Sequence, residues 1–123
     1  MIIPTPSVSV IGIGQMGLGI AKNIQNLGYL NSIFEININL LDEFNNIENL
    51  IINDAEIGLK SSNVLIFVVP STKQIRDFLF SSNWIDNIEK NTIIVDLTTS
   101  NPDETKKLSK ELNERNIRYI DCG

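Results

Sequence analysis

The chain has 123 residues, of which 42% are hydrophobic, and a formal net charge of −5. This length suits a single domain with a buried core. The acidic balance, without any basic block, argues against partners such as nucleic acid or an anionic membrane surface. The absence of histidine removes a common metal ligand and general base, so we expect no metal site.

The composition also predicts a cellular compartment. Residues 1–6 show neither the charged nor the apolar part of a signal peptide, and no apolar run is long enough to span a membrane. Cys122 is the single cysteine, so no disulfide can form within the chain. We therefore predict a cytoplasmic protein.

The first part of the chain combines a strand, a glycine-rich turn and a helix. Residues 8–11 are mostly β-branched, which is typical of a short buried strand. Gly12, Gly14 and Gly17 then form the pattern G-x-G-x-x-G. Gly28 is placed where a helix would end. Apolar residues recur between these points mostly every three or four positions, as on one face of a helix: Met16, Ile20, Ala21, Ile24 and Leu27.

The three glycines have separate roles in binding a dinucleotide. Gly12 permits a tight turn, Gly14 lets the backbone approach a pyrophosphate, and Gly17 lets the helix lie close to the sheet. The helix N-terminus offers unpaired N–H groups to the phosphates. A second β-rich run at residues 32–34 leads to Glu35, where a carboxylate can bind a ribose diol. A glycine turn needed only for packing is the alternative, but the complete strand–turn–helix–strand setting favours binding.

Glu35 also favours NAD over NADP. A carboxylate accepts hydrogen bonds from both ribose hydroxyls but repels a 2′-phosphate. No lysine or arginine stands between Lys22 and Lys60, so the segment after Glu35 offers no partner for that phosphate. A cation brought in from elsewhere in the fold would reverse this preference.

The rest of the chain alternates between strand-like and helical segments. The apolar runs predict strands at residues 48–52, 64–69, 92–96 and 117–120. Capping residues and spacing predict helical segments at residues 40–45, at 54–60, from Ser71 or Thr72 onward, and at 101–114. Two further groups are interpreted as a core cluster (Trp84, Ile85 and Ile88) and a solvated helix face (Lys106, Lys107 and Lys110).

This alternation predicts an α/β fold: a doubly wound, mainly parallel Rossmann sheet with helices on both faces, formed by one domain over residues 1–123. Ligands in such sheets bind beyond the carboxyl ends of the strands. Glu35, Val69-Pro70 and Thr98-Thr99 all follow strands, so we expect them to meet beside the glycine turn. For Thr98-Thr99, ordinary turn chemistry before Pro102 is an equally good explanation.

Several motifs occur here in the order found in a known enzyme family. Residues 12–17 are GIGQMG and residues 21–24 are AKNI, while Val69-Pro70 precedes a helix and residues 96–102 are DLTTSNP. These resemble the G-x-G-x-M-G, A-x-N-L, L-P and D-x-S-T-x-x-P motifs of the β-hydroxyacid dehydrogenases, which include 3-hydroxyisobutyrate and tartronate semialdehyde dehydrogenases. Glu35 stands where that family more often has aspartate.

The resemblance implies two groups of ligand-binding residues. Substrate would be bound by Thr98 and Thr99, with Thr98 keeping the hydroxyl of the family's serine. The cofactor-binding residues would be Gly12, Ile13, Gly14, Gln15, Met16, Gly17, Glu35, Val69, Pro70, Gln74 and Thr99.

The same resemblance implies an NAD-dependent oxidoreductase that transfers a hydride to or from a small 3-hydroxy acid. The family's catalytic lysine belongs to a later segment that is absent here, so this chain contains no catalytic residue. The family's helical second domain, which would complete the cleft and form a homo-oligomer, is absent too. We therefore expect the 123-residue chain to bind NAD and to catalyse little.

Two other functions stay open. An acidic domain without histidine is compatible with a non-catalytic module that binds a dinucleotide or a partner. The resemblance extends to the cofactor domains of imine reductases and of 6-phosphogluconate dehydrogenase, and Gly123 matches the latter branch. The substrate cannot be named, because its determinants in the family lie mostly beyond Gly123.

Overall fold

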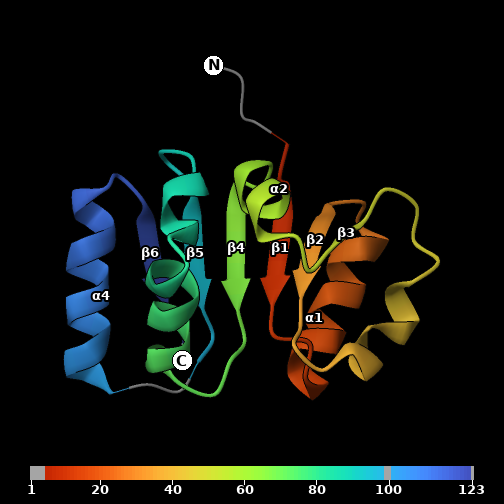
Figure 1. Ribbon diagram of the computed structural model, residues 1–123, viewed down its shortest axis with the longest axis horizontal. Coiled ribbons are helices and arrows are strands. Elements are labelled where there is room, and N and C mark those ends of the chain that lie inside the picture. The colour runs from red at the N-terminus through yellow and green to blue at the C-terminus, as the bar shows by residue number, and fades with distance from the viewer. Residues whose placement is uncertain (1–4, 99–100, 123) are drawn as a thin grey trace.

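A computed structural model describes residues 5–98 and 101–122. Six strands form one sheet in the order β3-β2-β1-β4-β5-β6, and all neighbouring strands are parallel (Figure 1). The predicted doubly wound α/β fold is confirmed. The strands are β1 (Val8–Ile11), β2 (Leu30–Phe34), β3 (Ile51–Ile52), β4 (Val64–Phe67), β5 (Ile93–Asp96) and β6 (Arg118–Asp121).

Helical segments connect these strands. The α-helices are α1 (Gln15–Asn26), α2 (Ala55–Lys60), α3 (Thr72–Arg76) and α4 (Pro102–Glu114). The other helical segments are the 3₁₀-helices η1 (Ile38–Phe44) and η3 (Trp84–Asn87) and a π-helical segment, η2 (Asp77–Ser81), that continues α3. Within the described residues, none of these helices is both long and apolar enough to cross a membrane.

The sheet separates two hydrophobic cores. On one face, α1 and η1 cover β1 and β2 with buried side chains such as Ala21 and Phe44. On the other face, α2, α3 and α4 cover the sheet from β2 to β6. Alternation along the strands turns Ile93 and Val95 toward the first face, where they are half-buried, and Ile120 is 47% exposed.

Two predicted helix starts are confirmed by their capping hydrogen bonds. The Asp54 carboxylate accepts a hydrogen bond from the Ile57 N–H at 3.2 Å, at the start of α2. The Asn101 side chain accepts one from the Asp103 N–H at 2.8 Å, with Pro102 as the first residue of α4.

Two strands are shorter than their apolar runs predict. The strand expected at residues 48–52 contains only Ile51–Ile52, because Asn49 has a φ of 66°, which breaks an extended segment. The strand expected at residues 64–69 ends at Phe67, and Val68, Val69 and Pro70 leave the sheet toward α3. The first difference lies at the amino end of β3, and the second lies at the carboxyl end of β4, the edge where ligands are expected to bind.

Candidate functional site

The glycine turn joins β1 to α1 and packs tightly against β2 and β4. Gly12 has a φ of 98°, a conformation that favours glycine, and its N–H donates to the Phe34 carbonyl at 2.9 Å. A Cβ on Gly12 would lie 2.1 Å from the Val68 carbonyl oxygen, and one on Gly17 would lie 1.8 Å from the Gly12 oxygen. Packing within the chain therefore requires glycine at both positions.

Gly14 differs from these two glycines. Its φ of −75° and ψ of −167° are open to most residues, and a Cβ would meet no atom within 4 Å. Gly14 precedes α1 and has no side chain to cap the N–H groups of the first turn, which also contains no acidic residue. Packing alone does not explain glycine here, whereas close approach of an anionic ligand does.

The Glu35 carboxylate lies directly against the glycine turn. One oxygen accepts a hydrogen bond from the Ile13 N–H at 2.8 Å, and the other accepts one from the Asn37 N–H at 2.9 Å. Glu35 is half-buried, so its carboxylate is still accessible from the cleft. The acidic residue and the turn, predicted to act on one ligand, are thus in contact.

A cleft of about 1110 Å³ opens beside this contact. It is lined by the last residues of β1, β2 and β3 and by the segments that follow β1, β2, β3 and β4. The predicted residues that line it are Gly12, Gly14, Glu35, Val69, Pro70 and Gln74. It is also lined by residues that the sequence analysis did not place there, including Ile36, Asn53, Phe78 and Trp84.

The other predicted residues that the structure describes do not line the cleft. The Ile13 side chain is 1% exposed, and Gly17 is buried. Gln15 and Met16 lie in the first turn of α1, with Met16 58% exposed. Ile13 and Gly17 can therefore meet a ligand of the glycine turn only through their backbone, whereas the side chains of Gln15 and Met16 are exposed beside the turn.

Thr98 is the predicted residue whose environment differs most from expectation. Its side chain is 2% exposed, and its hydroxyl oxygen accepts a hydrogen bond from the Val69 N–H at 3.5 Å. It therefore packs between the ends of β4 and β5 and does not line the cleft. Thr99, predicted to bind both cofactor and substrate, lies outside the described residues.

The turn at Thr98 is held by a buried polar group on β5. Asp96 is 0% exposed, and one of its oxygens accepts a hydrogen bond from the Thr98 N–H at 2.7 Å. The other accepts one from the Tyr119 hydroxyl on β6. Burial of Tyr119, reinforced by that hydrogen bond, raises the pKa of Tyr119 well above its ordinary value, so the phenol stays protonated and donates.

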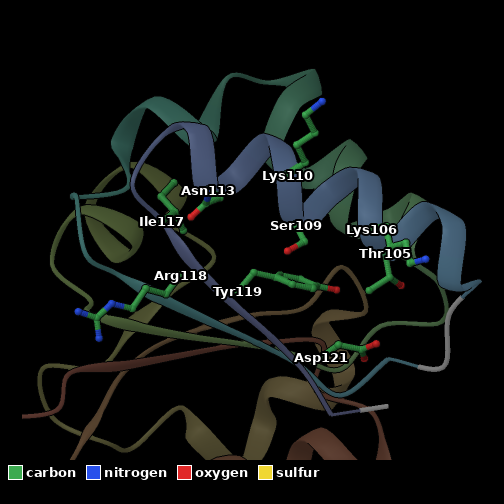
Figure 2. A pocket seen from close by; sticks show the side chains of 9 residues that line it. All are labelled: Thr105, Lys106, Ser109, Lys110, Asn113, Ile117, Arg118, Tyr119 and Asp121. Carbon is green, nitrogen blue, oxygen red and sulfur yellow. The ribbon is translucent and has the colours of Figure 1, made fainter.

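A second cleft, of about 640 Å³, lies between α4 and β6, next to Tyr119. Figure 2 shows Ser109 and Tyr119 facing each other across it, while the ends of Lys110 and Arg118 point away from that space. Lys106, Lys107 and Lys110 are exposed, in agreement with the predicted solvated face.

Comparison with known proteins identifies the family. Residues 7–123 match the sequence profile of a family described as the NAD binding domain of 6-phosphogluconate dehydrogenase. The chain belongs to this family. The match confirms the predicted relationship and shows that residues 7–123 form an NAD-binding domain.

Among characterised relatives, human mitochondrial 3-hydroxyisobutyrate dehydrogenase is 24% identical over 116 residues, which are 94% of this chain and 34% of that protein. The 2-hydroxy-3-oxopropionate reductase of Escherichia coli K12 is 29% identical over 113 residues, 91% of this chain and 38% of the reductase. This chain thus spans about a third of the length of these relatives.

Solved structures share the fold at lower identity. An imine reductase variant from Myxococcus stipitatus in complex with NAD⁺ superposes with a TM-score of 0.81 at 20% identity, covering 96% of this chain and 40% of the reductase. The reductase in complex with NADP⁺ gives a TM-score of 0.80 at 20% identity, covering 94% and 40%. Both nucleotides therefore occur among structures that share this fold.

Proposed function

We propose that the cleft binds the adenosine diphosphate half of NAD. The observation that carries this proposal is the open space beside Gly14, between a helix N-terminus and the Glu35 carboxylate. The N–H groups at the start of α1 would hold the diphosphate, and Glu35 would accept hydrogen bonds from the ribose diol. The segment from Val69 to Gln74 would cover the nucleotide from the β4 side.

The charges around the cleft support NAD over NADP. Among the described residues that line the cleft, three are acidic (Glu35, Asp54 and Glu56) and none is lysine or arginine. A 2′-phosphate would add negative charge beside these carboxylates without a cation to pair with it.

The whole protein is proposed to be an NAD-dependent oxidoreductase of the cytoplasm that acts on a small 3-hydroxy acid and forms homo-oligomers. Support comes from the relatives named above and from the motif at residues 96–102, which resembles the substrate motif of β-hydroxyacid dehydrogenases. Bound NAD supplies the hydride chemistry, and this chain positions it. Thr98 and Thr99 would serve the substrate end, with the catalytic lysine on a later segment.

Gly14→Ala tests the nucleotide site directly. The added methyl group has room in the free protein, so thermal stability should not fall, but it would occupy space needed by the diphosphate. We expect affinity for NAD to fall about tenfold or more. Trp84 is the only tryptophan and lines the cleft, so its fluorescence can follow the titration.

Gly19→Ala is the matched control. Gly19 lies on the same helix, and its Cβ would likewise meet no atom within 4 Å. This variant should bind NAD like the wild type and gain slightly in stability. Equal NAD affinity in the two alanine variants and the wild type would refute the proposed site.

Calorimetry with NAD and NADP tests the role of Glu35. The wild type should bind NAD about tenfold or more tightly than NADP, and Glu35→Gln should reduce this ratio, because the amide no longer repels the 2′-phosphate. Tighter binding of NADP by the wild type would contradict the proposed preference.

A further inference from the structure

The residue that follows β3 has an unusual backbone conformation. The ladder between β2 and β3 pairs Ser32 with Ile51 and Ile33 with Ile52. Asn53 follows with a φ of 54°, although its N–H still donates to the Ile33 carbonyl at 2.9 Å. The backbone therefore leaves the sheet just before it would reach Glu35 on the neighbouring strand.

The side chain of Asn53 replaces the missing strand partner. Its Oδ1 accepts a hydrogen bond from the Glu35 N–H at 2.8 Å, and its Nδ2 donates to the Glu35 carbonyl at 3.0 Å. The side-chain amide thus supplies both an acceptor and a donor to the backbone of Glu35, the two bonds that the backbone of a longer β3 would have made. Two bonds to one residue restrain its backbone more than either bond alone.

Glu35 is consequently held from two sides. Asn53 fixes its backbone on the β3 side, and the Ile13 and Asn37 N–H groups hold its carboxylate. Asn53 itself lines the cleft, and β2 lies between it and the strand that leads into the glycine turn. Glycine would tolerate the left-handed backbone but has no amide, and aspartate would lack the Nδ2 donor.

We propose that Asn53 is a positioning residue for ribose recognition: its amide holds the Glu35 backbone so that the carboxylate stays at the glycine turn, ready to accept both ribose hydroxyls. This inference rests on the proposed binding of NAD. It assigns part of the selectivity for the 2′-hydroxyl to a residue that need not touch the nucleotide.

Asn53→Gly tests the proposal, since glycine keeps the positive φ and removes both hydrogen bonds. Calorimetry would compare NAD with its analogue that lacks the 2′-hydroxyl of the adenosine ribose. We expect the wild type to prefer NAD about tenfold and the variant about threefold or less, because the variant loses two hydrogen bonds to NAD but only one, from the 3′-hydroxyl, to the analogue. A purely structural loss would weaken both ligands equally and leave the ratio as it was, which would overturn the proposal.

A ligand-free measurement separates this inference from the proposed function. Amide hydrogen exchange, followed by NMR, should be about threefold or more faster at Ile13 in Asn53→Gly, because the Glu35 carboxylate no longer stays at the turn. Unchanged exchange at Ile13 would overturn the proposal even if NAD binds. Failure of the wild type to bind NAD, with faster exchange in the variant, would instead refute the proposed function alone.

Asn49→Gly is the matched control for both measurements. Asn49 lies just before β3, at the other end of that strand from Asn53, with a φ of 66°; it is exposed and does not hold Glu35. Its replacement should change neither the nucleotide ratio nor the exchange at Ile13. A change equal to that of Asn53→Gly would show that the segment around β3 as a whole, and not the Asn53 amide, sets the position of Glu35.

Discussion

The ends of β2 and β5 each have a carboxylate that holds a backbone N–H group, yet only one of them is open to a ligand. Glu35 is half-buried, lines the cleft and bonds two backbone N–H groups. Asp96 is fully buried and bonds the Thr98 N–H and the Tyr119 hydroxyl. At the carboxyl end of a parallel strand, each carboxylate accepts a hydrogen bond from the backbone N–H two residues later in the chain.

The two carboxylates differ in their exposure to solvent. Water or a ribose hydroxyl can replace a backbone partner of Glu35 at little cost, because the carboxylate is already partly solvated. Nothing outside the protein can reach Asp96, so its bonds can only fix the start of the turn at Thr98. Accessibility, more than residue type, thus separates a binding carboxylate from a structural one.

Replacing each carboxylate by alanine should sharpen this contrast most. Asp96→Ala leaves the Thr98 N–H and the Tyr119 hydroxyl without their buried partner, so we expect the free energy of unfolding to fall by about 3–5 kcal/mol. Glu35→Ala should cost about 1 kcal/mol, since water can reach the freed N–H groups. Urea denaturation measures both, and equal losses would contradict the comparison.

Tyr119→Phe removes one of the two bonds of Asp96 and should have a smaller effect. The ring packing is kept, so we expect a loss of about 1–2 kcal/mol in the free energy of unfolding. Tyr29→Phe is the control, because Tyr29 is 38% exposed and lies just before β2, at the end of the sheet opposite to Asp96. A variant of Tyr119 as stable as that control would show that the Asp96 carboxylate does not depend on β6.

Much of the fold could be predicted from local patterns. The apolar runs gave five strands with at least one end placed correctly, and the caps at Asp54 and Asn101 were identified from residue type. The late start of β3 and the early end of β4 could not be found in this way. Asparagine occurs throughout residues 37–63, and only the tertiary structure decides that Asn49 and Asn53 adopt a positive φ.

The candidate site was predictable where one segment supplies the contact. The glycine turn and its spacing to Glu35 are properties of a single strand–helix–strand unit, so both were identified. The contact of Asn53 with Glu35 and that of Tyr119 with Asp96 depend on the register between strands. The same dependence explains why Thr98 was expected in the crevice but packs against Val69.

Alkaline pH should give the smallest effect and separates the two carboxylates in another way. Because burial raises the pKa of Tyr119 above its ordinary value of 10.0, the unfolded chain loses this proton first, and the wild type should become less stable as pH rises above about 10. Partial exposure of the ring moderates the slope. Tyr119→Phe should be less sensitive to pH in this range, whereas Glu35→Ala should keep the wild-type slope.

Lys73, whose pKa is raised by its hydrogen bond to Asp77, is common to all three proteins, so its effect on the slope cancels in the comparison. Identical slopes in the wild type and Tyr119→Phe would mean that the phenol is not held by the buried carboxylate, and the distinction between the two strand ends would then rest on Asp96 alone.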